Sequence, residues 1–199
     1  MPKLYIDICH INGKFSSSIQ SRKKLKKLQH YLGLTRIKQR PANNREYSVS
    51  HSHEYVIVAS YINKIGIDIE LINKIRSRRA EILSDEERQL IKQYGFTCIW
   101  VLKEAIAKYH TTGLIKINTI VVNKISAYNV TYSINTEHNK KVNILEYKFI
   151  DIDSNYRLCV VTKNMPDILV RVNEDNQIDY GKCKENTNYA RKRCYFRNT

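Results

Sequence analysis

Acidic and basic side chains recur at fixed spacings in two parts of the chain. The run Gly-Ile-Asp-Ile-Glu alternates polar with apolar residues, which predicts a strand with Asp68 and Glu70 on one face. The later run Trp-x-x-Lys-Glu-Ala-x-x-Lys places Glu104 and Lys108 four residues apart, on one face of a predicted helix. Carboxylates about 7 Å apart along a strand repel each other unless a cation or a shared proton intervenes. If the helix face meets the strand, three carboxylates and an ammonium form a pocket suited to Mg²⁺ and a phosphate group.

The composition limits the class of protein. A chain of 199 residues has the length of one domain, or of two small halves that share a core. Its formal net charge of +15 predicts a polyanionic partner, such as a nucleotide cofactor, a nucleic acid, an anionic membrane or an acidic protein. The five cysteines form no Cys-x-x-Cys motif, which favours a reducing, cytoplasmic compartment. We expect no signal peptide, because the first eleven residues include Lys3, Asp7 and His10, and no membrane span, because no apolar run approaches about 20 residues.

The first part of the chain predicts strands around one helix. Strands are expected over 4–11 and 55–61, and Asn63-Lys64 predicts that the second of these forms a hairpin with the strand of Asp68. The helix between them carries a cationic face, which is either solvated or a phosphate cradle and which comprises Arg22, Lys23, Lys26 and Lys27.

The second part of the chain predicts two helices followed by strands. Ser84 begins a capping-box pattern for a helix that ends at Tyr94, and Thr97 can cap a second helix that ends near Tyr109. Four alternating or apolar runs then predict strands over Ile117–Val122, Tyr128–Ile134, Val142–Ile150 and Tyr156–Thr162.

Each candidate residue also has a purely structural interpretation. Asp68 and Glu70 taken alone fit a solvated strand face, and Glu104 with Lys108 fits an ordinary helix ion pair. His51 between two serines can simply cap a turn. The basic charge with an acidic cluster also fits a Mg²⁺-dependent nuclease or a non-catalytic basic nucleic-acid-binding module. The common signature of such nucleases places Lys two residues after Glu on a strand, whereas here Lys103 precedes Glu104 on a predicted helix, which argues against a nuclease. A non-catalytic binding module would not need Asp68, Glu70 and Glu104 to converge.

The order of the motifs resembles one family. Ser48-Val49-Ser50-His51-Ser52 comes first, Gly66-Ile67-Asp68-Ile69-Glu70 second, Trp100-Val101-Leu102-Lys103-Glu104-Ala105-Ile106-Ala107-Lys108 third and Gly113-Leu114 last. Over roughly residues 35–163 this resembles the surfactin-synthetase-activating type of 4′-phosphopantetheinyl transferase. The resemblance implies an α+β fold of two similar α/β halves, 1–62 and 63–165, related by a pseudo-twofold with the active site in the cleft between them. Residues 166–199 are then expected to be a basic tail.

The resemblance also implies a reaction and its residues. The phosphopantetheine arm of coenzyme A is transferred to a serine of an acidic acyl or peptidyl carrier protein, and adenosine 3′,5′-bisphosphate leaves. The protein is expected to act as a monomer, without a membrane or nucleic-acid partner. The implied Mg²⁺ ligands are Asp68, Glu70 and Glu104, and the implied catalytic residues are Glu104, as the base, and Lys108. The expected coenzyme contacts are Arg40, Ser50, His51, Lys103 and Lys108.

Overall fold

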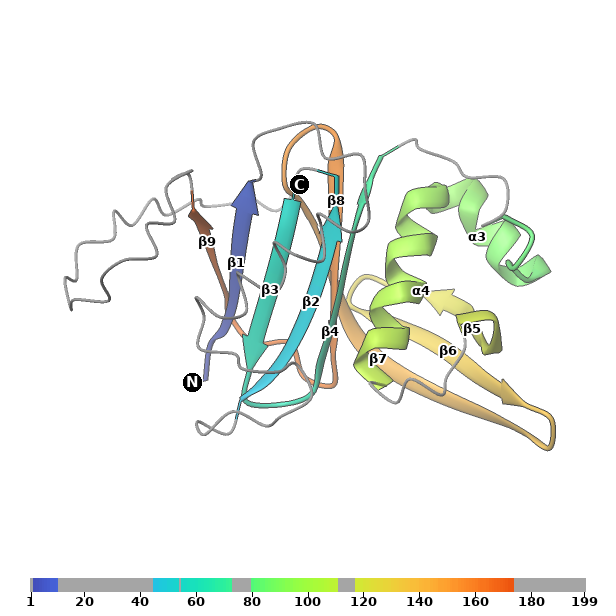
Figure 1. Cartoon of the computed structure of the whole chain (residues 1–199). Coiled ribbons are helices and arrows are strands. Elements are labelled where there is room, and N and C mark those ends of the chain that lie inside the picture. Colours follow the sequence, from blue (N-terminus) through green and yellow to red (C-terminus); the bar gives the residue numbers. More distant parts are fainter. Residues whose placement is uncertain (1, 11–44, 54, 73–79, 111–116, 174–199) are drawn as a thin grey trace.

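The computed structural model describes residues 2–10, 45–53, 55–72, 80–110 and 117–173. These residues form two sheets, and the first contains four strands in the order β2-β3-β1-β9 (Figure 1). β3 lies antiparallel to both β1 and β2, whereas β9 lies parallel to β1. The bounds of these strands are β1 Leu4–His10, β2 Glu46–Ser52, β3 Tyr55–Tyr61 and β9 Ile168–Asn173.

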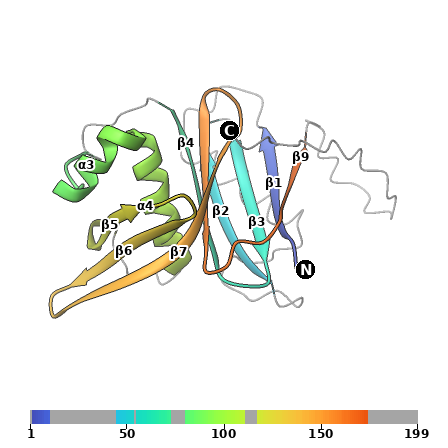
Figure 2. The same ribbon diagram turned by 180° about the vertical axis from the view of Figure 1, so that it is seen from behind.

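The second sheet contains five antiparallel strands in the order β4-β8-β7-β6-β5. Its strands are β4 Ile65–Leu71, β5 Ile120–Ile125, β6 Asn129–Thr136, β7 Asn139–Asp151 and β8 Tyr156–Thr162. A short 3-10 helix, η1, spans Ile117–Thr119 before β5. Seen from behind, β6 and β7 form a long hairpin that projects away from the first sheet (Figure 2).

The two helices of the described residues follow β4 in the chain. α3 spans Asp85–Tyr94 and begins with the predicted capping box, in which Ser84 and Glu87 each accept a hydrogen bond from the other's backbone N–H. α4 spans Phe96–His110 and packs against β4 and β8. The two helices predicted for the second part of the chain are confirmed to within a residue or two. Neither described helix has the length and apolar character that crossing a bilayer requires.

The alternation along β4 divides its side chains between two cores. Ile65, Ile67 and Ile69 point into a core shared by the two sheets. The opposite face of the five-stranded sheet packs against α4 in a second core, to which Cys159 and Val161 of β8 contribute. The intervening residues of β4, including Asp68, therefore face the helix.

Two expectations about strand pairing were wrong. β3 and β4 do not form a hairpin, because β3 pairs with β1 and β2 while β4 pairs with β8 in the other sheet. The chain after Pro166 is not all tail, because β9 adds a parallel strand to β1. The α+β class is confirmed, and the pseudo-twofold relation between the halves stays a prediction. The predicted cationic helix face and Arg40 lie outside the described residues.

Candidate active site

Three carboxylates from two elements converge between β4 and α4. Ligand oxygens of Asp68, Glu70 and Glu104 all lie within 4.8 Å of one another. The strand supplies two of them because residues two apart share a face, and the helix supplies the third. The structure therefore brings together the set that the sequence predicted as metal ligands.

The absence of a side chain at Gly66 allows α4 to lie directly on β4. A Cβ atom built at this glycine would lie 2.0 Å from the carbonyl oxygen of Ala105 and 2.5 Å from the backbone nitrogen of Tyr109. These two residues bracket Lys108 and follow Glu104 on the helix. Gly66 thus sets the distance between the acidic face of the strand and the polar face of the helix.

Lys108 lies against the same carboxylates. Its Nζ donates to Asp68 Oδ1 at 2.7 Å and to Ser50 Oγ at 2.8 Å, so β2, β4 and α4 meet at one ammonium. The Asp68 side chain is almost fully buried, with 3% of its surface exposed, whereas Lys108 is one-third exposed. An ammonium has three donors, and these two bonds leave one for another acceptor.

The donor set fits a hard divalent cation. Asp68 Oδ2 is buried and has no hydrogen-bond partner among the described residues. A buried charged oxygen in that state is costly unless a cation meets it. The cluster combines three carboxylates with one ammonium, so its formal charge is compensated by one divalent ion. Carboxylate oxygens are the ligands that Mg²⁺ prefers in proteins.

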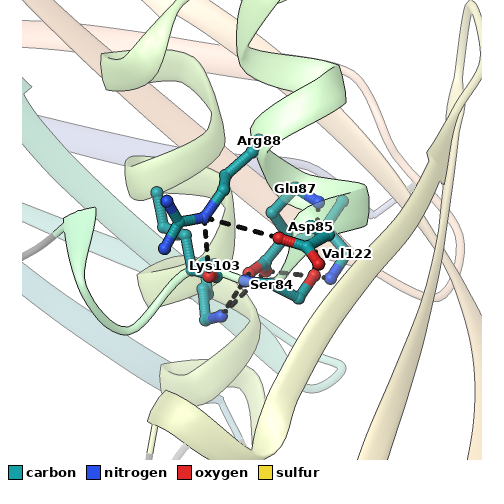
Figure 3. A network of polar contacts seen from close by, with 7 residues as sticks. Ser84, Asp85, Glu87, Arg88, Lys103 and Val122 are labelled. Atoms are coloured by element: carbon teal, nitrogen blue, oxygen red, sulfur yellow. Dashed lines mark hydrogen bonds and ion pairs between the residues drawn. The ribbon is translucent and has the colours of Figure 1, made fainter.

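Lys103 does not face this site, so its predicted contact with coenzyme A was wrong. Its Nζ donates to both carboxylate oxygens of Glu87 at 2.8 Å, and both side chains are buried (Figure 3). Burial lowers the pKa of the Lys103 amine, and the hydrogen bond to Glu87 opposes this shift. Lys103 lies about 100° around the helix axis from Glu104, which explains why adjacent residues have different surroundings.

The Glu87 carboxylate joins three elements. Besides Lys103 of α4, it accepts hydrogen bonds from the backbone nitrogens of Ser84, at the start of α3, and of Val122 in β5 (Figure 3). Of these contacts, the sequence pattern predicts only the capping box. The additional signal was an acidic residue followed sixteen positions later by a lysine that lies among apolar residues of a helix.

The side chains of Ser50 and His51 point to opposite faces of β2, because adjacent residues of a strand alternate between its two faces. Ser50 is buried and points toward β4, whereas His51 is exposed on the other face of β2. Ser50 Oγ is bonded within the protein rather than open to a phosphate. The predicted coenzyme contacts of Ser50 and His51 stay predictions.

One protein family matches the part of the chain that contains the acidic cluster. No curated protein matches the chain at a significant level. The family model described as the 4′-phosphopantetheinyl transferase superfamily matches residues 64–161, the segment that contributes all three carboxylates and Lys108.

Proposed function

We propose that the protein transfers the 4′-phosphopantetheine arm of coenzyme A to a serine of an acyl or peptidyl carrier protein, with Mg²⁺ as the metal. One observation carries this proposal: the oxygens of Asp68, Glu70 and Glu104 lie within 4.8 Å of one another inside the segment that matches the superfamily. The net charge of +15 suits both a coenzyme with several phosphates and an acidic carrier.

The proposed reaction is a displacement at phosphorus. The serine hydroxyl of the carrier attacks the phosphorus that bears the pantetheine arm, and a new phosphorus–oxygen bond forms. The bond to the bridging oxygen of the pyrophosphate breaks, and adenosine 3′,5′-bisphosphate leaves with that oxygen. A bound Mg²⁺ would supply positive charge to the pyrophosphate oxygens. Glu104 accepts the serine proton in this proposal, as the resemblance to the family implies, and its carboxylate lies at the cluster.

Lys108 supplies the second positive charge. Its two hydrogen bonds to Asp68 and Ser50 fix the ammonium at the edge of the cluster, and its remaining donor is available for the leaving bisphosphate. Positioned charge of this kind stabilises a transition state in which negative charge develops on the leaving group.

The family match favours the transferase over the nuclease and over the non-catalytic binding module. Both alternatives were based on the basic composition, which the proposed substrates also explain. Incubation with plasmid DNA and Mg²⁺ distinguishes the transferase from the nuclease, because the transferase leaves the DNA intact.

Mass spectrometry of an apo carrier protein tests the proposal directly. The carrier is incubated with this protein, coenzyme A and Mg²⁺, and its mass is expected to rise by one phosphopantetheine group. Asp68→Asn and Glu104→Gln keep the size of each side chain but remove one negative charge, so both variants are expected to lose transfer. Glu137→Gln is the matched control, since Glu137 is exposed at the turn between β6 and β7. Absence of transfer to fatty-acid, polyketide and peptide carriers would refute the proposal.

A further inference from the structure

At the seam between the two sheets, β2 lies beside β4. Serine side chains of β2, rather than its backbone, accept hydrogen bonds from the backbone of β4 there. β4 pairs with β8 on one edge, and the backbone N–H groups of Ile67 and Ile69 point away from β8 toward β2. Ser48 Oγ accepts from Ile67 N at 3.0 Å and Ser50 Oγ accepts from Ile69 N at 3.2 Å. Both serines are buried, so two hydroxyls satisfy two backbone donors that water cannot reach.

Only one of these two serines also touches the acidic cluster. Ser50 Oγ donates to Asp68 Oδ1 at 2.8 Å and accepts from Lys108 Nζ at 2.8 Å. No hydrogen bond joins Ser48 to either of these side chains in the described part of the chain. Two residues of the same type, two positions apart on one strand, therefore make the same seam contact but differ in their relation to the site.

The hydrogen-bonding capacity of Ser50 is fully used. A hydroxyl carries one donor hydrogen and two acceptor lone pairs. Ser50 donates to Asp68 and accepts from Ile69 N and Lys108, which occupies all three positions. No capacity remains for a phosphate oxygen.

Ser50 and Lys108 also distinguish the two oxygens of Asp68. Oδ1 accepts a hydrogen bond from each of them, whereas Oδ2 is buried without a partner among the described residues. Fixing one oxygen fixes the rotation of the carboxylate about its bond to Cβ. The unpartnered oxygen is then held in one direction, as a metal ligand needs.

We propose that Ser50 is a positioning residue for the metal: it holds Asp68 by Oδ1, so that Oδ2 is presented to a divalent cation, and it keeps Lys108 beside that carboxylate. This inference rests on the proposed function, because the cation is the one that the transferase would use. It assigns Ser50 no contact with the coenzyme.

Binding of Mn²⁺, followed by the electron paramagnetic resonance signal of the free ion, tests this role without measuring transfer. Ser50→Ala is expected to weaken Mn²⁺ binding about tenfold, since loss of a partner that orients a ligand costs about 10–100-fold in metal affinity. Ser48→Ala is the matched control, and its Mn²⁺ affinity is expected to stay within about twofold of wild type. Urea unfolding of both variants without metal is expected to show similar losses of stability, because each loses one buried hydrogen bond to a backbone N–H.

The possible outcomes separate this inference from the proposed function. Equal Mn²⁺ affinities of Ser50→Ala and wild type would overturn the positioning role alone. The same holds if Ser50→Ala binds coenzyme A more weakly in EDTA while its Mn²⁺ affinity is unchanged, because that result would make Ser50 a coenzyme contact. Absence of Mn²⁺ binding by wild type would overturn the metal site together with this role. Should Ser50→Ala not fold, Ser50→Cys replaces the oxygen with a weakly bonding sulfur and is expected to show the same loss of Mn²⁺ affinity.

Discussion

Substitution of Gly66 by alanine is expected to separate the two halves of the acidic cluster. The added Cβ would lie 2.0 Å from the carbonyl oxygen of Ala105 and 2.9 Å from the Cα of Tyr109, and both obstacles are backbone atoms of α4. No side-chain rotation relieves such an overlap. The helix itself has to move away from β4.

The size of that movement follows from the contact distances. Ordinary contacts of a Cβ atom begin at 3.4 Å, so the oxygen of Ala105 and the new methyl group must separate by about 1.4 Å. Metal–ligand distances tolerate changes of only about 0.2 Å. A displacement of about 1 Å at an active site can lower the rate about a hundredfold. Overpacking of a tight contact also costs about 1–3 kcal/mol, and we expect the upper end here because backbone is involved.

Two measurements on Gly66→Ala check this reasoning. Urea unfolding is expected to show a loss of about 3 kcal/mol, and Mn²⁺ binding is expected to weaken at least about tenfold because Glu104 moves away from Asp68 and Glu70. Gly95→Ala is the control: Gly95 has a φ of 83°, but nothing lies within 4 Å of its Cβ position. This control is expected to lose about 1–3 kcal/mol of stability through backbone strain, with Mn²⁺ affinity nearly unchanged. A Gly66→Ala variant that binds Mn²⁺ like wild type would show that Glu104 is not a ligand fixed by helix docking.

Three further substitutions have defined outcomes. Lys103→Met is expected to lower the free energy of unfolding by about 3–5 kcal/mol, because it leaves the buried carboxylate of Glu87 without its counter-charge; Glu87→Gln in the same chain is expected to restore part of the loss in urea unfolding. Lys108→Met is expected to slow carrier loading but to tighten Mn²⁺ binding at least about threefold, because the variant removes a positive charge beside Asp68 while Ser50 still holds Oδ1 of that carboxylate. His110 is hydrogen-bonded to Tyr132, and its burial together with the charges of Lys64 and Lys141 lowers the pKa of its ring. The unfolded chain therefore takes up the proton first, and wild type is expected to lose stability relative to His110→Gln as the pH falls below about 6.5 in urea unfolding.

Each of these results has a contradicting counterpart. Unchanged stability of Lys103→Met would mean that water reaches Glu87 and that the buried pair does not fix α4. Weaker Mn²⁺ binding by Lys108→Met would mean that the ammonium orients Asp68 more than it repels the ion. Parallel pH profiles of wild type and His110→Gln would show that the histidine titrates alike in the folded and unfolded chains.

The acidic cluster could be predicted because local periodicity determines it. A period of two along β4 fixes Asp68 and Glu70, and a spacing of four along α4 fixes Glu104 and Lys108. The sequence pattern also had to imply that α4 packs on the face of β4 that carries Asp68 and Glu70. The glycine at position 66 makes this packing possible. These relations depend on short stretches of sequence, so one chain was enough to infer them.

The errors concern contacts between residues distant in sequence. The short connection before β4 favoured a hairpin, but the partner of this strand, β8, lies about ninety residues later. Lys103 is adjacent to Glu104, yet its partner is a carboxylate of another helix. Ser50 precedes a histidine in a motif that suggests phosphate binding, and the side chains that it contacts, Asp68 and Lys108, come from two elements that the motif does not include. Side-chain type and spacing do not encode these partners.

The strand β9 has a consequence for how the chain is made. Arg171 of β9 and Asp7 of β1 form an ion pair across 164 positions of sequence, so β1 leaves the ribosome long before β9, the described strand that pairs with one of its edges. Until then the backbone groups on that edge of β1 stay open to other chains, at a synthesis rate of about 5–20 residues per second. Nascent chains stalled before β9 has left the ribosome are therefore expected to bind a chaperone at this edge. Once β9 has emerged and paired with β1, the chaperone is expected to dissociate.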